Sequence, residues 1–311
     1  MEFVDEDEKL NDNSPTETYR VRDDSEKCGI AWGQRKLLLS LVSFLTNFLD
    51  KKKRYRVVYA GAAPGINIGI VSQLFPEVIW HLYDPDNISL KTDFTKGIIV
   101  YQKKFTDYEA QYWAEQQKLK DDIYFISDIR TVDHNRSQNL SEHEEHILED
   151  MEMQKRWVEI IRPRYSQLKF RPPYSIPGVP QTINYFSGII YKTPWAPQSS
   201  TETRLVVENN FSYREYNCEI YQSQMFYHNN TLRKTENCQD KELVKELVND
   251  WDCLCELHIW KKFLERKKIN STPEKISNWA TEMLNVGRSK KKYDTLNKLR
   301  NEPRAIQKRN T

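Results

Sequence analysis

Short apolar runs alternate with longer amphipathic stretches through the central part of this sequence. This alternation is typical of an α/β fold, in which a central, mostly parallel sheet is flanked by helices. Apolar residues recur at helical spacing from Leu37 to Leu49 and are followed by the β-rich run Arg56–Ala60, so we predict a helix that leads into a first, central strand. Further strand candidates are Val78–Tyr83, Gly97–Tyr101, Ile123–Ser127, Gln167–Phe170, Tyr185–Tyr191 and Arg204–Val207.

Helical patterns separate these runs near residues 66–75, 106–118 and 141–162. The last pattern begins with Ser141-x-x-Glu144, which resembles a capping box whose two side chains satisfy free amides at a helix start. A long amphipathic helix from Leu243 to His258 closes the domain, and we interpret His258, on its apolar face, as a core histidine rather than a ligand.

The two ends of the chain carry opposite charge, although the net charge is only +2. Residues 1–27 hold ten acidic and four basic side chains, whereas residues 288–311 hold nine basic and two acidic ones. Neither end has hydrophobic periodicity, so we expect a flexible acidic segment at 1–28, one folded domain at 29–286 and a disordered basic tail at 287–311. The tail either adds phosphate affinity or only increases solubility.

The composition argues against membrane and disulfide-rich proteins. No run approaches the roughly 18 apolar residues of a spanning helix, and the acidic start is unlike a signal peptide, so we expect a soluble, cytoplasmic protein without a membrane partner. The five cysteines lack the spacing of a disulfide framework or a zinc site, and we predict no metal.

A loop rich in small residues follows the first strand. Gly61 and Gly65 lie in it, and glycines at a strand-to-helix turn let backbone amides approach a ligand closely. Asp84 follows the second strand, where nucleotide-binding α/β folds commonly place an acid on a ribose diol. The loop lacks the features of a Walker A motif and of a dinucleotide fingerprint. It therefore indicates a cofactor site, although a tight turn beside an incidental aspartate would give the same pattern.

Four charged residues adjoin apolar sequence: Lys36, Asp128, Lys169 and Glu202. Asp128 closes one predicted strand and Lys169 interrupts another, and ligands of open α/β sheets bind beyond the carboxyl ends of the strands. A lysine that is crowded by burial or by a second cation can act as a base. Ordinary surface charge beside strands is the alternative explanation for each residue taken singly.

Five motifs in this order resemble the family of poxvirus cap-specific mRNA 2′-O-methyltransferases, which also serve as the small, processivity-conferring subunit of poly(A) polymerase. The resemblance runs from Ala31 to Asn229. The motifs are Gly33-Gln34-x-Lys36-Leu37, Val57-Val58-Tyr59-x-Gly61-x-Ala63-Pro64-Gly65, Ile126-Ser127-Asp128-x-Arg130, Leu168-Lys169-x-Arg171-x-Pro173 and Ala196-Pro197-x-x-Ser200-x-Glu202-x-Arg204-Leu205.

The resemblance implies a Rossmann-like methyltransferase fold that uses S-adenosyl-L-methionine, hereafter the methyl donor, and methylates the first transcribed nucleotide of capped mRNA. It implies a catalytic set of Lys36, Asp128, Lys169 and Glu202. Lys169 would take the proton of the ribose hydroxyl, Lys36 would favour its neutral form by like-charge repulsion, and the acids would orient both ammonium groups. Implied cofactor contacts are Gln34, Tyr59, Gly61, Gly65, Asn67, Asp84 and Asp128, with Asn67 and Asp86 departing from the family's residues.

The implied cap pocket departs further from the family. Tyr174 matches one of two aromatic rings that enclose the 7-methylguanine, and Tyr19 is a candidate for the other. The two acid positions correspond to Ile176 and Gln222, of which Gln222 can still accept a hydrogen bond. The expected partners are RNA, in particular 5′-capped mRNA, and a poly(A) polymerase catalytic subunit. Two alternatives stay open: a non-catalytic RNA-binding processivity subunit, and an FtsJ-like 2′-O-methyltransferase acting on uncapped RNA.

Overall fold

The computed structural model describes residues 3–20, 33–50, 54–90, 97–120, 122–131, 140–197, 199–233 and 251–285. Its contacts divide the chain into two compact units. The sheet unit comprises Phe48–Lys192 and Glu202–Ser223, and the helical unit comprises Met1–Asn47, Thr193–Thr201 and Gln224–Thr311. The range predicted as one domain, 29–286, thus contributes to both units, and the predicted basic tail at 287–311 lies outside the described residues.

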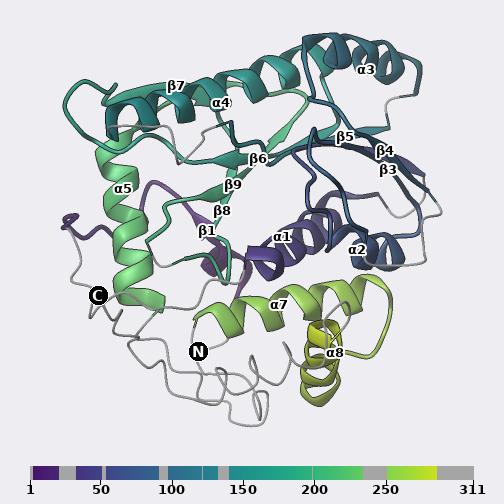
Figure 1. Cartoon of the computed structure of the whole chain (residues 1–311). Helices are drawn as coiled ribbons and strands as arrows, with labels where there is room; N and C mark the ends of the chain where they lie inside the picture. The colour runs from purple at the N-terminus through teal and green to yellow at the C-terminus, as the bar shows by residue number, and fades with distance from the viewer. Residues whose placement is uncertain are drawn as a thin grey trace. The chain divides into compact units, whose positions relative to one another are not determined.

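A mostly parallel sheet forms the centre of the sheet unit (Figure 1), which confirms the predicted α/β class. Its strands run in the order β8-β9-β6-β5-β2-β3-β4, and neighbours from β6 through β4 are parallel whereas β9 and β8 are antiparallel additions. The strands are β2 (Tyr55–Ala60), β3 (Val78–Tyr83), β4 (Ile98–Tyr101), β5 (Ile123–Ser127), β6 (Tyr165–Phe170), β8 (Ile189–Tyr191) and β9 (Thr203–Glu208). The central strands β2, β3 and β5 are rich in apolar residues because helices cover both faces of a parallel sheet.

Helices α3 (Asp107–Lys120) and α4 (Leu140–Ile161) lie on one face of this sheet, and α2 (Ile68–Leu74) lies on the other (Figure 1). Trp113 of α3 and Trp157 of α4 are almost completely buried. The Trp113 Nε1 donates a hydrogen bond to the Tyr83 hydroxyl at 3.0 Å, so the large ring is buried without leaving its N–H group unsatisfied.

The predicted strand region Tyr185–Tyr191 contributes to two different sheets. Its first part belongs to β7 (Thr182–Phe186), which pairs with β10 (Tyr213–Asn217) in a separate antiparallel ribbon, and its second part is β8. Gly188 lies at the change of sheet, where a Cβ atom would come within 2.3 Å of the Val206 carbonyl oxygen. Only glycine allows this close approach of two backbones.

The helical unit contains η1 (Asp5–Glu8), β1 (Lys9–Leu10), α1 (Gly33–Phe48), η3 (His228–Leu232), α7 (Trp251–Arg266) and α8 (Pro273–Asn285), while α5 (Cys218–Tyr227) spans the boundary between the units. Glu8 and Leu10 are buried, so part of the segment that we expected to be flexible is packed. None of the helices in the described ranges has the length and apolar character needed to span a bilayer.

Two local predictions need correction. Ser141 is the second residue of α4, and Glu144 does not close a capping box. The Glu144 carboxylate instead accepts hydrogen bonds from both terminal nitrogens of the Arg171 guanidinium. Such a buried, two-pronged ion pair stabilises the carboxylate more than a helix amide would. His258 is not enclosed by apolar side chains alone, since its Nε2 lies 2.8 Å from Asp5 Oδ1. The predicted helix residues 243–250 lie outside the described residues.

Candidate active site

The carboxyl ends of β2, β3 and β5 meet at one edge of the sheet. Ala60 pairs in register with Tyr83 on one side and with Ser127 on the other. The next residues are tied by backbone hydrogen bonds, from the Gly61 amide to the Tyr83 carbonyl and from the Asp128 amide to the Ala60 carbonyl, both 2.9 Å long. Gly61, Asp84 and Asp128 therefore lie close together at the carboxyl ends of three adjacent strands.

The loop after β2 requires its two glycines. Gly61 has a φ of +81°, and a Cβ atom there would lie 2.8 Å from backbone atoms of Asp128 and Ile129. Gly65 has a φ of +70°, and a Cβ atom there would lie 2.6 Å from the Ile88 side chain. Both positions favour glycine for its left-handed backbone as well as for space.

Asp84 supports this loop from the neighbouring strand. Its Oδ2 accepts the Ala63 amide and its Oδ1 accepts the Asp86 amide, both at 2.9 Å. Each carboxylate oxygen keeps a further lone pair for a ligand hydroxyl.

A pocket of about 780 Å³ opens beside Asp84. It lies in the size range of pockets that hold cofactors and other small molecules. Its walls include Gly61, Ala63, Asp84 and Asp128 at the strand ends, Lys104, Phe105, Thr106 and Tyr108 near the start of α3, Arg130 and Thr131 after β5, and Met153, Arg156 and Trp157 of α4.

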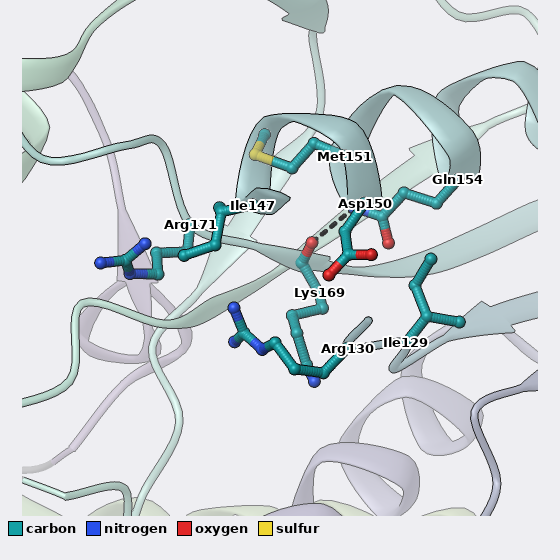
Figure 2. A pocket seen from close by; sticks show the side chains of 8 residues that line it. All are labelled: Ile129, Arg130, Ile147, Asp150, Met151, Gln154, Lys169 and Arg171. Carbon is teal, nitrogen blue, oxygen red and sulfur yellow. Dashed lines mark hydrogen bonds between the residues drawn. The ribbon is translucent and has the colours of Figure 1, made fainter. Parts of the chain in front are cut away.

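Lys169 lies in β6 with its backbone held by α4. The Gln154 Nε2 donates to the Lys169 carbonyl oxygen at 2.6 Å, and the lysine side chain points away from α4 (Figure 2). A cavity of about 10 Å³ lies behind it, lined by Asp150, Met151 and the other residues drawn. This volume accommodates no more than one water molecule, so the backbone of Lys169 rests on a closely packed support.

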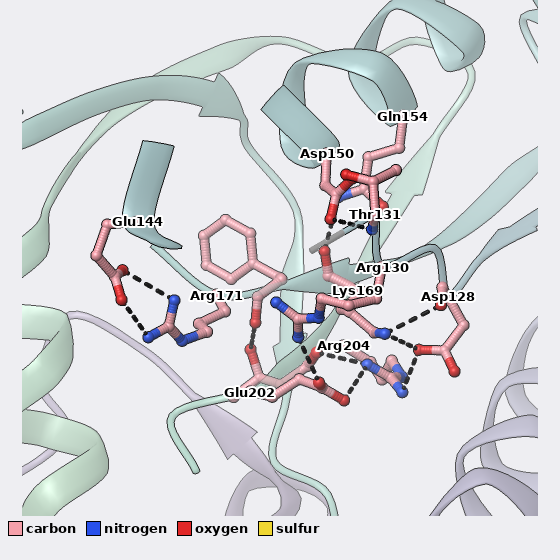
Figure 3. A network of polar contacts seen from close by, with 12 residues as sticks. Asp128, Arg130, Thr131, Glu144, Asp150, Gln154, Lys169, Arg171, Glu202 and Arg204 are labelled. Atoms are coloured by element: carbon pink, nitrogen blue, oxygen red, sulfur yellow. Dashed lines mark hydrogen bonds and ion pairs between the residues drawn. The ribbon is translucent and has the colours of Figure 1, made fainter. Parts of the chain in front are cut away.

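The Lys169 ammonium group belongs to a continuous chain of charges (Figure 3). Its Nζ lies 2.9 Å from Asp128 Oδ1 and donates to the Asp128 carbonyl oxygen at 3.0 Å. The Arg204 Nη2 lies 3.0 Å from the same Asp128 oxygen, and the Arg204 Nη1 lies 2.9 Å from Glu202 Oε1. Arg204 thus bridges the two carboxylates. Arg130 contacts Glu202 from the other side at 3.2 Å.

Burial makes this cluster rigid. Arg204 is 3% and Glu202 is 7% exposed. Burial by itself would lower the pKa of Arg204, but Asp128 and Glu202 outweigh it and raise that pKa, so Arg204 is a permanent cation. Tyr59 is buried beside this cluster. Its burial, and to a smaller extent the negative charge of Asp128, raise the pKa of its hydroxyl, so the hydroxyl stays neutral.

The predicted cap-binding residues are engaged within the protein. The Arg171 guanidinium lies over the Tyr174 ring, 4.2 Å from its centroid, and Glu144 binds both Arg171 and the Tyr174 amide. The Gln222 Oε1 accepts the Ser175 amide at 3.1 Å. One face of Tyr174 and one acceptor site of Gln222 are thus already used.

The structure brings together some of the predicted site residues but not all. Asp128, Lys169 and Glu202 form one cluster, while Gly61, Asp84 and Asp128 line one pocket. Gly65 and Asn67 belong to the loop but not to the pocket wall; the Asn67 Nδ2 is buried and, within the described residues, has no hydrogen-bond partner. Gln34, Lys36 and Tyr19 belong to the helical unit.

Arg204, Arg130 and the pocket wall formed by α3 and α4 were not predicted as parts of the site. Arg204 lies directly opposite Lys169 in the register of β6 and β9. It is the first residue of the predicted strand Arg204–Val207, so it does not interrupt an apolar run as Lys169 does, and the criterion that selected Lys169 could not have selected it.

Three comparisons relate the chain to known proteins. The model of the family described as poly A polymerase regulatory subunit matches residues 8–286. A cap-specific mRNA (nucleoside-2′-O-)-methyltransferase of Fowlpox virus (strain NVSL) is 28% identical over 218 residues, which cover 65% of this chain and 68% of that protein. The structure of bluetongue virus VP4, described as a multifunctional RNA-capping production line, superimposes with a TM-score of 0.41 at 16% identity, covering 69% of this chain and 36% of VP4. Because the family model spans most of its length, the chain belongs to the poly A polymerase regulatory subunit family.

Proposed function

We propose that this chain is a methyltransferase that transfers the methyl group of S-adenosyl-L-methionine to a ribose 2′-hydroxyl of RNA, at the first transcribed nucleotide of capped mRNA. One observation carries the proposal: Asp128 lines the pocket at the strand ends and also forms the ion pair with Lys169. The place for a nucleoside-like cofactor is therefore directly beside a candidate base. The similarity to the Fowlpox virus methyltransferase supports the same reaction.

The residues around the pocket suit the methyl donor. The carboxylate of Asp84 has acceptor capacity for a ribose diol. Gly61 brings the loop backbone to the pocket wall at a position where a Cβ atom would not fit. Gln34, Tyr59 and Asn67 are the remaining proposed contacts. When bound, the cofactor supplies an activated methyl group whose sulfonium carries its own positive charge, so the protein has to align and deprotonate the acceptor oxygen.

Lys169 is the proposed base. Gln154 fixes its backbone, and Asp128 holds its ammonium group near the pocket. Arg204 occupies the same Asp128 oxygen and keeps its charge, so it competes with Lys169 for this carboxylate and repels a second cation. We propose that Lys169 accepts the proton of the bound 2′-hydroxyl and that Lys36 is the second lysine of the catalytic set.

Recognition of the cap is proposed to be less selective than in a pocket with two acids. Ile176 cannot accept a hydrogen bond, and the Gln222 carbonyl oxygen already accepts the Ser175 amide. We therefore expect weak discrimination between 7-methylguanine and guanine, with Tyr174 contributing mainly stacking.

The experiment compares four acceptors of one sequence, carrying a 7-methylguanosine cap, an unmethylated guanosine cap, a 5′-triphosphate or a 2′-deoxyribose at the first nucleotide of the capped RNA. Labelled methyl groups should enter the two capped RNAs at rates within about tenfold of each other. The 2′-deoxy RNA should accept none. Transfer to the triphosphate RNA alone would show that the substrate is uncapped RNA and not capped mRNA. Transfer to the 2′-deoxy RNA would refute the 2′-hydroxyl as the acceptor.

The family description favours a second candidate function, that of a non-catalytic regulatory subunit of a poly(A) polymerase. Both functions can be present in one chain. Adding the wild-type chain or Lys169→Ala to a poly(A) polymerase catalytic subunit and measuring tail length separates them, because a regulatory role does not need a base. If both chains lengthen the poly(A) tails equally and the wild-type chain methylates no acceptor, only the regulatory function remains.

A further inference from the structure

A second buried cluster of charges lies in the helical unit. Asp252 and Glu256 occupy successive turns of α7 and are 0% and 1% exposed. A buried carboxylate is costly unless charged and polar donors compensate it, and such groups contribute more to specificity of arrangement than to net stability. The partners of these two acids therefore indicate what the cluster holds in place.

Glu256 binds α1 and the connection between β8 and β9. Its Oε2 accepts the Arg35 Nε and the Trp195 Nε1, both at 2.7 Å, and its Oε1 accepts the Arg35 Nη2 and the Trp260 Nε1. Four donors occupy the roughly four lone-pair sites of one carboxylate. Arg35, in the first turn of α1, is thereby fixed by two parallel hydrogen bonds.

Asp252 holds the same connection by its backbone. Its Oδ1 accepts the Trp195 amide at 3.0 Å, and its Oδ2 accepts Arg233 at 2.7 Å. Arg233 in turn donates to the Ala196 carbonyl oxygen at 2.9 Å and to Asn229 at 3.0 Å.

Asn229 completes the tether, because its Nδ2 donates to the Ser200 carbonyl oxygen at 2.8 Å. Backbone groups of Trp195, Ala196 and Ser200 are therefore all anchored. The α7 network is defined here as Arg35, Trp195, Asn229, Arg233, Asp252 and Glu256.

The anchored connection has a strained backbone. Trp195 has a φ of +62°, which is rare for a bulky residue and therefore strained. Such a conformation persists only where the surroundings determine it, and here the Trp195 amide and indole N–H groups do so by donating hydrogen bonds to Asp252 and Glu256. A relaxed connection would break the hydrogen bonds that these two nitrogens donate to Asp252 and Glu256.

We infer that the α7 network is a positioning device for methyl transfer, and this inference rests on the proposed function. Arg35 lies between Gln34 and Lys36, and Ser200 lies two residues before Glu202. By binding Arg35 and Asn229, this network fixes the residue between Gln34 and Lys36 and the chain two residues before Glu202. The network residues are positioning residues rather than catalytic ones.

The test uses Asn229→Ala, which removes the hydrogen bonds to the Ser200 carbonyl and to Arg233 and leaves Arg233 paired with Asp252. Its control is Asn230→Ala, on the same short helix η3, whose side chain contacts Glu17 rather than the β8–β9 connection. Single-turnover transfer is measured at saturating methyl donor and RNA, methyl-donor affinity by calorimetry, melting temperature by circular dichroism, and amide exchange by mass spectrometry on a peptide covering residues 193–203.

Asn229→Ala should lower the transfer rate by about tenfold or more, because small misplacements of reacting groups have large effects on rate. Its methyl-donor affinity and melting temperature should stay near those of Asn230→Ala, and exchange should rise only in the 193–203 peptide. Equal transfer rates for the two variants, or a loss explained by lower melting temperature alone, overturns the inference. A wild-type chain that methylates no RNA instead refutes the proposed function.

Discussion

Replacement of Lys169 separates chemistry from stability at this site. Lys169→Ala removes one ion pair and one hydrogen bond to the Asp128 carbonyl. Asp128 does not become an unpaired buried charge, because Arg204 still contacts its Oδ1. Both Lys169 and Asp128 side chains are 14% exposed, so we expect the free energy of unfolding to fall by only about 1 kcal/mol.

The effect on methyl transfer should be much larger. A positioned general base contributes about 10²–10⁴ in rate, which corresponds to roughly 2.7–5.5 kcal/mol of activation free energy. Cofactor affinity should change little, because Gly61, Asp84 and Asp128 remain. Lys169→Arg should not restore activity, since a guanidinium keeps its proton in proteins and cannot accept another.

The assay is single-turnover transfer of labelled methyl to a defined capped RNA, with cofactor binding measured separately by calorimetry. Lys155→Ala is the matched control, because Lys155 is another partly buried lysine that contacts a backbone carbonyl, that of Asn184, outside the charge cluster. Near-normal turnover of Lys169→Arg would show that Lys169 has an electrostatic or structural role and is not the base.

Two further predictions test the loop and the N-terminal segment. Gly61→Ala should abolish measurable cofactor binding and lower the free energy of unfolding by about 1–3 kcal/mol, because its Cβ atom would overlap the backbone of Asp128 and Ile129. The control Gly33→Ala should leave stability unchanged or raise it, because nothing lies within 4 Å of a Cβ atom at that position. Equal cofactor affinity of the two variants in calorimetry would contradict this prediction. Burial raises the pKa of Glu8 from its ordinary 4.5 to about 7, so the folded state binds more protons than the unfolded state between these values and its stability falls as the pH rises through them. Glu8→Gln can still accept the Ser43 hydroxyl, so above about pH 7 it should unfold at a higher urea concentration than wild type. The gain in the free energy of unfolding should reach up to about 3 kcal/mol there and disappear toward pH 4.5. Parallel pH profiles of stability for the two proteins would refute the raised pKa of Glu8.

The sequence by itself was sufficient for the strands of the parallel sheet. The predicted strands Val78–Tyr83 and Ile123–Ser127 have the bounds of β3 and β5. Strands buried on both faces are short continuous apolar runs, so composition alone marks their ends. Polar residues at those ends meet at one edge of a parallel sheet, which is why Asp84 and Asp128 could be assigned to a common crevice.

Pairings between distant charges could not be predicted in this way. Sequence spacing suggested a capping box for Glu144, but the tertiary fold offers it Arg171, a stronger partner 27 residues away. The same reasoning missed Arg204 as the bridge between Asp128 and Glu202, because the bridge exists only once β9 lies antiparallel to β6.

The α7 network shows the same division. Helical periodicity places Asp252 and Glu256 one turn apart on α7, and the sequence determines that much. Which donors those two carboxylates receive depends on where α1 and the β8–β9 connection pack, so only the tertiary structure decided that Glu256 binds Arg35, 221 residues away. Local propensity and apolar patterning act over a few residues, so the sequence specifies helices and strands. A buried charge instead pairs with whichever donor the folded chain brings beside it, and the local sequence carries no signal for that partner.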